Sequence, residues 1–149
     1  MVRIDFHFNA PDKHGYVCRL ARKARAAGAK LVIYSTDARL LDDLDRQLWT
    51  FSEADFLPHC RAGDANAAMT PIILMGAEAS ADESGAAVPH HEVLVNLDEG
   101  WPPLFTRFER LIEVVTTAEA DKAAGRRRWK FYKDRGYDLT HHDQSKAAQ

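Results

Sequence analysis

Residues 117–139 carry the side chains with the clearest chemical potential in this chain of 149 residues. Between positions 122 and 135 there are seven basic residues and one acid, a local charge of +6, so the remainder carries −8 against a net charge of −2. Aromatic residues lie among these charges. The segment is predicted to be a helix that Thr117 caps and Gly136 ends, because such residues are favoured at helix termini.

One face of this predicted helix gathers three cations and an indole. At about 100° per residue, the four side chains fall within roughly one third of the circumference. They are Arg126, Trp129, Lys130 and Lys133. Such a face suits single-stranded nucleic acid, whose bases stack, or an acidic peptide that ends in an aromatic residue and a free carboxylate. A solvated basic helix with its aromatic residues in the core is the structural alternative.

The other reactive side chains form no recognisable catalytic or metal-binding motif. The pairs His90–His91 and His141–His142 lack the HxxxH spacing that lets two imidazoles converge on one metal ion. His59 and Cys60 are neighbours on an extended chain and point in different directions, so His59 is expected to bond to the backbone. Three acids are most simply a solvated helix face: Asp42, Asp43 and Asp45.

The sequence also lacks the common nucleotide-binding motifs. The first predicted strand runs into residues 8–12, FNAPD, without the glycine-rich turn that approaches a pyrophosphate. Neither GxxxxGK[ST] nor GxSxG occurs. We therefore expect no cofactor, no metal ion and no enzymatic activity. An α/β enzyme with an unrecognised site is the alternative that motif searches leave open.

Composition indicates a soluble globular chain. The apolar fraction is 46% and the charged fraction is 28%. No stretch approaches the ~18 apolar residues that a membrane span requires. Cys18 and Cys60 give neither a disulfide framework nor a metal-ligand spacing, so a reducing, cytoplasmic setting is expected.

Strands and helices alternate along the chain, and this order must position the basic helix. Strands are predicted at 2–8, 30–35, 71–75 and 92–96, and helices at 11–27 and 36–49. This order, with short apolar strands, predicts an α/β domain whose mainly parallel sheet is flanked by helices. One domain is assigned to residues 1–139, with a flexible loop at 76–90 and a disordered tail at 140–149.

Residues 101–115 have two interpretations. Trp101 and the two prolines after it can begin a short helix that runs through Phe105 and Phe108. Residues 111–115, LIEVV, are then either the end of that helix or a further strand. Glu113 interrupts this apolar run, whose β-branched residues favour the strand.

Aromatic residues also gather where the second predicted helix ends. They are Trp49, Phe51 and Phe56. Composition alone favours a place in the core, whereas a hydrophobic patch for a partner protein is the functional alternative, because Trp and Phe anchor interfaces.

Two segments resemble the chi subunit family of bacterial DNA polymerase III. Residues 41–63, LDDLDRQLWTFSEADFLPHCRAG, contain Leu-Asp-x-x-Leu-Trp followed by Phe-x-Pro-His-x-x-Ala-Gly. Residues 126–139, RRRWKFYKDRGYDL, resemble the closing basic and aromatic helix of that family. The likeness follows nearly the whole chain in order and is weak at 76–90 and in the tail.

This resemblance implies a Rossmann-like fold without a nucleotide, and a non-catalytic replisome adaptor. Chi proteins belong to the clamp-loader assembly through a small psi subunit, and they bind the acidic C-terminal tail of single-stranded DNA-binding protein. The family's tail site lies on the last helix, where tyrosine often stands at position 129 and arginine at position 133. The matching residues here are Arg126, Trp129, Lys130 and Lys133. An apolar neighbour from 111–115 is expected to complete a pocket for the tail's phenylalanine.

The resemblance also assigns the aromatic residues of the second helix. The family's hydrophobic surface for psi, or for a helicase-like partner, maps to Trp49 and Phe56. Nucleic acid would then be contacted only indirectly. Direct binding of a single strand by the basic helix is the alternative function, and the −8 carried elsewhere opposes it.

Overall fold

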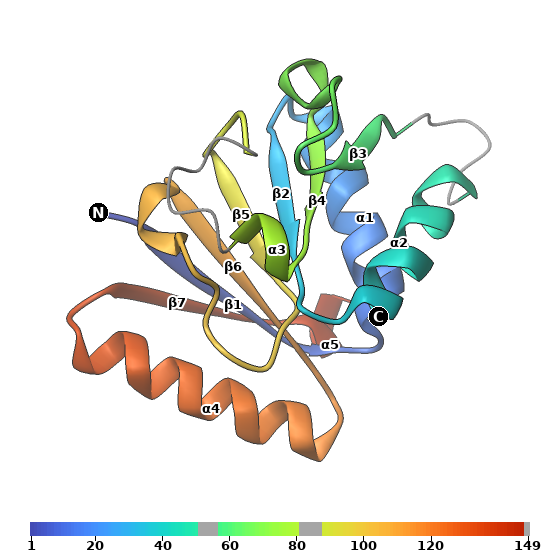
Figure 1. Cartoon of the computed structure of the whole chain (residues 1–149). Coiled ribbons are helices and arrows are strands. Elements are labelled where there is room, and N and C mark those ends of the chain that lie inside the picture. The colour runs from blue at the N-terminus through green and yellow to red at the C-terminus, as the bar shows by residue number, and fades with distance from the viewer. Residues whose placement is uncertain (51–56, 81–87, 148–149) are drawn as a thin grey trace.

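The computed structural model describes residues 1–50, 57–80 and 88–147. Within these residues seven strands form one parallel sheet in the order β3-β4-β2-β5-β6-β1-β7 (Figure 1). The strands are β1 (Arg3–Ala10), β2 (Leu31–Tyr34), β3 (His59–Arg61), β4 (Ile72–Met75), β5 (Val93–Asn96), β6 (Arg110–Thr116) and β7 (Asp138–Asp143). The predicted α/β class and its parallel sheet are therefore confirmed.

Helices cover the two faces of the sheet unequally (Figure 1). The helices are α1 (Lys13–Ala26), α2 (Ala38–Thr50), α3 (Ala77–Ser80), α4 (Glu119–Asp134) and α5 (Gln144–Ala147), with 3₁₀ turns η1 (Ala67–Met69) and η2 (Phe105–Arg107). One core joins α1 and α2 to the sheet through residues such as Val17 and Leu44. The other core lies beneath α4 and includes Phe6, Leu111 and Tyr132.

Alternation along β1 separates these two cores. Ile4 and Phe6 are buried on the α4 side, whereas Asp5 and His7 point to the opposite side. The predicted strand at 111–115 is also confirmed, as part of β6. The helix expected through residues 101–108 is wrong: only the 3₁₀ turn η2 forms there, because Leu104 before it adopts a left-handed conformation with a φ of 64°.

The C-terminal segment differs from the expected disordered tail. Residues 138–143 form the edge strand β7, which pairs with β1 from Arg3 opposite Asp138 to Phe8 opposite Asp143. The Thr140 hydroxyl donates to Asp5, and Asn9 Nδ2 donates to Asp143 Oδ1 at 3.0 Å. The side chains of β7 are largely exposed, so the segment lacks the apolar pattern by which strands are recognised.

Asp5 is an ionised carboxylate on β1, between its two neighbouring strands β6 and β7. Burial by itself would raise the pKa of Asp5, but hydrogen bonds from Thr140 and Arg110 hold it below its ordinary value. The Arg110 Nε atom lies 2.5 Å from the Asp5 carboxylate. An ionised carboxylate on β1 therefore links both neighbouring strands.

The expected loop at 76–90 is partly helical. Residues 77–80 form α3, and Val88 is buried, whereas 81–87 lie outside the described residues. No helix within the described ranges is long and apolar enough to cross a membrane.

His7 is a buried titratable group on the α1 side of the sheet. Its Nδ1 atom hydrogen-bonds with the Tyr16 hydroxyl, and its ring centroid lies 5.2 Å from that of His142. Burial, together with His142 and Arg110, lowers the pKa of His7 to about 4, against an opposing effect of Asp5. The folded protein therefore favours neutral His7.

Lowering the pH from ~6.5 to ~4 should reduce the free energy of unfolding, because unfolded His7 binds a proton in this range while folded His7 stays neutral. The contribution should be roughly 2 kcal/mol, since solvent screens part of the effect. Urea denaturation at a series of pH values measures it. His7→Gln should flatten this part of the profile, and the exposed control His141→Gln should not. Equal slopes in the wild type and His7→Gln would contradict the assignment.

Candidate functional site

A buried ion pair holds α4 on the sheet. Arg128 Nε donates to Glu113 Oε1 at 2.9 Å, and the two side chains are 1% and 0% exposed. Tyr132 donates its hydroxyl to Glu113 Oε2 at 2.5 Å, and Asn96 Nδ2 donates to Glu113 Oε1 at 2.7 Å. Arg128 Nη1 also donates to the carbonyl of Glu99 at 2.8 Å. These bonds connect α4 with β6, β5 and the segment after β5.

The electrostatics of this cluster depend on burial. Burial raises the pKa of Glu113, while Arg128 and the hydrogen bonds from Tyr132 and Asn96 oppose the rise. The pKa of Tyr132 is raised by burial and by the neighbouring carboxylate. Glu113, the acid that interrupts the apolar run of β6, is therefore the group to which α4 is bonded.

Gly125 lets α4 lie close to β6. A Cβ atom built at this position would be 2.9 Å from Val115 Cγ2 and 3.2 Å from Val115 Cγ1. The shorter of these distances is essentially never seen for a real Cβ atom, so a larger residue would force Val115 or the helix to shift. The close approach places Val115 directly beside the cationic flank of α4.

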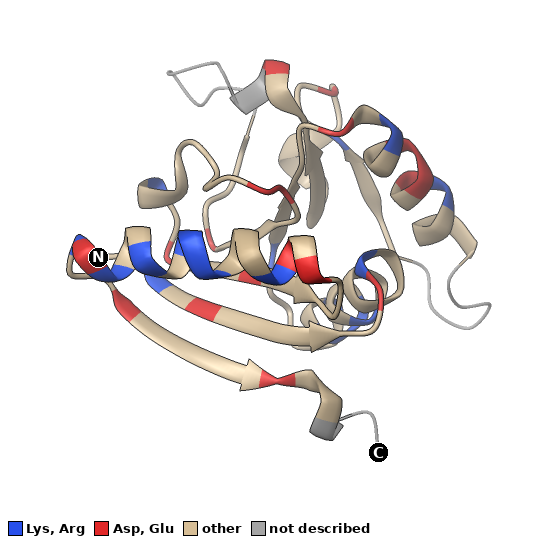
Figure 2. Ribbon diagram, turned by 90° about the horizontal axis from the view of Figure 1, so that it is seen from below, with Lys and Arg blue, Asp and Glu red and all other residues tan. Residues whose placement is uncertain are grey.

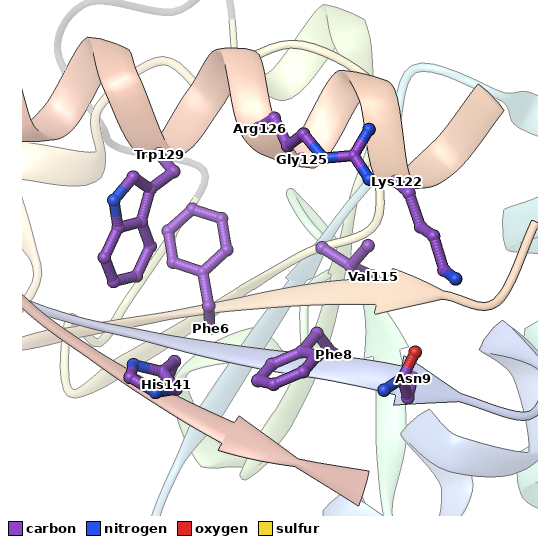
Figure 3. A pocket seen from close by; sticks show the side chains of 9 residues that line it. All are labelled: Phe6, Phe8, Asn9, Val115, Lys122, Gly125, Arg126, Trp129 and His141. Atoms are coloured by element: carbon purple, nitrogen blue, oxygen red, sulfur yellow. The ribbon is translucent and has the colours of Figure 1, made fainter. Parts of the chain in front are cut away.

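A groove of about 510 Å³ lies between this flank of α4 and the strands β1, β6 and β7 (Figure 3). We call it the α4 groove. It is lined by Phe6, Phe8, Asn9, Val115, Lys122, Gly125, Arg126, Trp129 and His141. Val115 is the residue of segment 111–115 that lines this groove together with Trp129.

Aromatic rings form one end of the α4 groove. Trp129 packs edge-to-face on Phe6, with ring centroids 5.1 Å apart, and lies 6.0 Å from His141. Phe8 lies 5.9 Å from His141 on the neighbouring strand. Trp129 is half-buried, so one part of the indole packs on the sheet while another part faces the groove. These rings can accept another aromatic side chain at favourable edge or face geometry.

Two cations line the rim of the groove. Lys122 and Arg126 are one helical turn apart, and neither forms an ion pair with any residue that the structure describes. Figure 2 shows the cationic residues following one another along α4. The α4 groove therefore combines an apolar floor with basic groups at hydrogen-bonding reach of an anion.

The structure divides the predicted face of the basic helix. Arg126 and Trp129 line the α4 groove together, whereas Lys130 and Lys133 are exposed beside it and do not line it. The sequence did not single out Lys122, although its position four residues before Arg126 is a signal of helical spacing. The groove residues from β1 and β7 show no sequence pattern that would have indicated a binding site.

The predicted N-terminal cap of α4 is wrong, because Ala118 occupies that position and α4 begins at Glu119. Asp121 instead accepts the backbone N–H of Thr116 at 2.7 Å and its hydroxyl at 2.9 Å. The predicted C-terminal signal is confirmed, since Gly136 has a φ of 80°.

The second candidate surface lies on α2. Trp49 is 57% exposed, so its assignment to the core is wrong. Its ring centroid lies 4.8 Å from that of His59. His59 Nδ1 lies 2.8 Å from the Leu57 carbonyl, which confirms the predicted bond between this histidine and the backbone. Phe51 and Phe56 lie outside the described residues.

No cluster of three or more His, Cys, Asp or Glu residues suitable for a metal ion occurs in the described part of the chain.

Comparison with known protein families gives more direct information on function. A family model described as "DNA polymerase III chi subunit, HolC" matches residues 1–140. The chain belongs to this chi family. Membership places the protein among the accessory subunits of DNA polymerase III.

Individual members of the chi family match over most of their length. DNA polymerase III subunit chi of Pseudomonas aeruginosa is 30% identical over 146 residues, which cover 95% of this chain and 96% of that protein. The chi subunits of Haemophilus influenzae and Escherichia coli are 25% and 23% identical, and each alignment covers 83% of this chain. The alignments cover 81% and 80% of those two proteins.

Replacing Arg128 by Met should lower the free energy of unfolding by about 3–5 kcal/mol, because buried Glu113 would lose its cation. Arg127→Met is the matched control, since Arg127 is exposed on the same helix, and it should change stability by less than about 0.5 kcal/mol. Urea denaturation measures both. Similar stabilities for the two variants would show that the ion pair does not hold α4 in place.

Proposed function

We propose that this chi family protein binds the acidic C-terminal tail of single-stranded DNA-binding protein in the α4 groove. It thereby links that protein to the clamp loader of DNA polymerase III and catalyses no reaction. The observation that carries the proposal is the combination, in one groove, of an aromatic and apolar floor with two cations that lack ion-pair partners among the described residues.

The floor of the groove suits the phenylalanine of the tail. Phe6 and Trp129 already pack edge-to-face, and Val115 supplies methyl groups beside them. A phenyl ring entering here would exchange water for apolar contacts on several sides. Burying such a ring contributes roughly 1.5–3 kcal/mol, so it should supply much of the affinity.

The rim of the groove suits the carboxylates of the tail. Arg126 can bind a carboxylate through two parallel hydrogen bonds, and Lys122 can add a further charge-assisted bond. Lys130 and Lys133, exposed further along α4, can attract the aspartates that precede the C-terminus. Exposed ion pairs contribute little each, so the cations should mainly set specificity, association rate and salt dependence.

The clamp-loader side of the adaptor is assigned to the region of Trp49. This indole is exposed on α2 yet packs on buried His59, so it presents a supported apolar surface. Exposed tryptophans of this kind commonly anchor protein interfaces. The partner would be a psi subunit or a helicase-like protein. Phe56, the other residue assigned to this surface, lies outside the described ranges.

A labelled acidic peptide that ends in Pro-Phe should bind, and the same peptide without its final Phe should bind at least about 10-fold more weakly. Fluorescence anisotropy measures both affinities. Binding of the full peptide should weaken by roughly 10-fold or more in each of three variants: Arg126→Glu, Lys122→Glu and Trp129→Ala. Lys130→Glu should have a smaller effect, because Lys130 does not line the groove.

The matched control is Arg39→Glu, the same charge reversal at an exposed position of α2, which should leave peptide binding unchanged. Equal binding of the two peptides, or equal loss in Arg39→Glu and Arg126→Glu, would contradict a specific groove. An oligonucleotide that competes for the same groove residues would instead favour the alternative, direct binding of single-stranded nucleic acid.

The salt dependence of peptide binding should distinguish the contribution of the cations on the rim from that of the aromatic floor. Raising the ionic strength from about 50 mM to about 500 mM should weaken peptide binding by roughly one order of magnitude. Arg126→Gln should reduce this dependence, whereas Trp129→Ala should weaken binding but keep the same slope. Anisotropy titrations at several salt concentrations measure the slopes. If Arg126→Gln has the same salt dependence as the wild type, Arg126 does not bind the carboxylates of the peptide.

A further inference from the structure

The flank of α4 opposite the α4 groove carries a second aromatic and basic surface. Trp101, in the segment between β5 and η2, stacks on Phe131 of α4 with ring centroids 3.7 Å apart and an interplanar angle of 6°. The Arg135 guanidinium carbon lies 3.6 Å from the Phe131 centroid, and Arg135 Nη1 donates to the Phe131 carbonyl at 3.2 Å. A stacked indole leaves no room for the guanidinium on the same face. Trp101 and Arg135 therefore cover opposite faces of Phe131.

One face of Trp101 remains open. The residue is 50% exposed although Phe131 covers one face of its indole, so the exposed area belongs mainly to the other face. Phe131 supports the indole on its covered face, and Arg135 covers the far face of Phe131 in turn. A ligand that stacks on this indole would thus meet a preformed flat surface and would not have to order it.

Cations flank this surface along the helix. Arg127 and Arg135 lie one turn before and one turn after Phe131, about 6 Å away in each direction along the axis. Both are exposed, and Arg127 has no ion-pair partner among the described residues. We call this group of four side chains the Trp101 platform. It comprises Trp101, Arg127, Phe131 and Arg135.

The ligand that matches the platform is a chain of anions with flat rings between them. Single-stranded nucleic acid has this form, because a base can stack on the open indole while a neighbouring phosphate reaches Arg127. An aromatic side chain of a peptide would leave its outer face in water on so open a surface. A base can instead continue its stack with the next base.

We propose that the Trp101 platform binds single-stranded nucleic acid, with one base stacked on Trp101 and a neighbouring phosphate at Arg127. This surface differs from the face containing Trp129, whose indole already packs on Phe6 in the groove. Peptide and nucleic acid would then occupy opposite flanks of α4 at once. The acids nearest in sequence, Glu99 and Asp134, predict a weak and strongly salt-dependent affinity.

The test is anisotropy of a labelled oligothymidylate of about 12 nucleotides, at low salt, with the full chain. Trp101→Ala and Arg127→Glu should each weaken binding by about 10-fold, and Trp101→Phe should keep most of it because phenylalanine also stacks. Trp129→Ala and Arg39→Glu are the matched controls and should bind as the wild type. A saturating acidic Pro-Phe peptide should leave the oligonucleotide bound.

Several results would overturn the proposal. These are the absence of binding at low salt, equal binding by wild type, Trp101→Ala and Arg127→Glu, or loss of binding in Trp129→Ala with displacement by the peptide. The Arg127→Glu variant should fold normally, because this side chain is exposed on the helix surface, so it tests the proposal even if Trp101→Ala does not fold. If Trp101→Ala lost binding of the acidic peptide but kept binding of the oligonucleotide, the platform would be a peptide site. The peptide titration with Arg126→Glu tests the α4 groove independently, so the two proposals can fail separately.

Discussion

The arrangement of α4 depends on the buried ion pair between Arg128 and Glu113. A charged pair with 1% and 0% exposure is costly to leave incomplete, so the helix can rotate little about its axis without breaking it. With Arg128 turned towards β6, the helical period places Trp129 on one flank and Phe131 on the other. The same interaction thus determines both the α4 groove and the Trp101 platform. Gly125 complements it by allowing α4 to lie close to Val115.

The α4 groove is a composite of segments far apart in the chain. β1 supplies Phe6 and Phe8, and β7 adds His141 at the edge of the sheet. β7 is held in register by its pairing with β1 and by the bond from Thr140 to Asp5. A carboxylate on one face of β1 therefore positions a strand that contributes to a site on the other face. Changes at Asp5 should be expected to reach the groove through β7.

The proposed surfaces lie on different sides of the molecule, which suits an adaptor. The groove and the platform occupy opposite flanks of α4, and Trp49 projects from α2 on the other face of the sheet. A partner at Trp49 would consequently leave both flanks of α4 accessible. This separation agrees with membership in a family of accessory subunits of DNA polymerase III.

The sequence by itself determined the parallel α/β order, the basic helix, its glycine end and the pairing of Arg126 with Trp129. Each of these follows from a local period or a terminal residue, which neighbouring positions are enough to reveal. Tertiary structure alone decided that Arg128 is buried while Arg126 and Arg127 beside it are exposed, and that Trp101 stacks on Phe131. It also decided that the polar residues of β7 form a strand. These outcomes depend on pairing between distant segments, and such long-range contacts leave no periodic signal in the residues that make them.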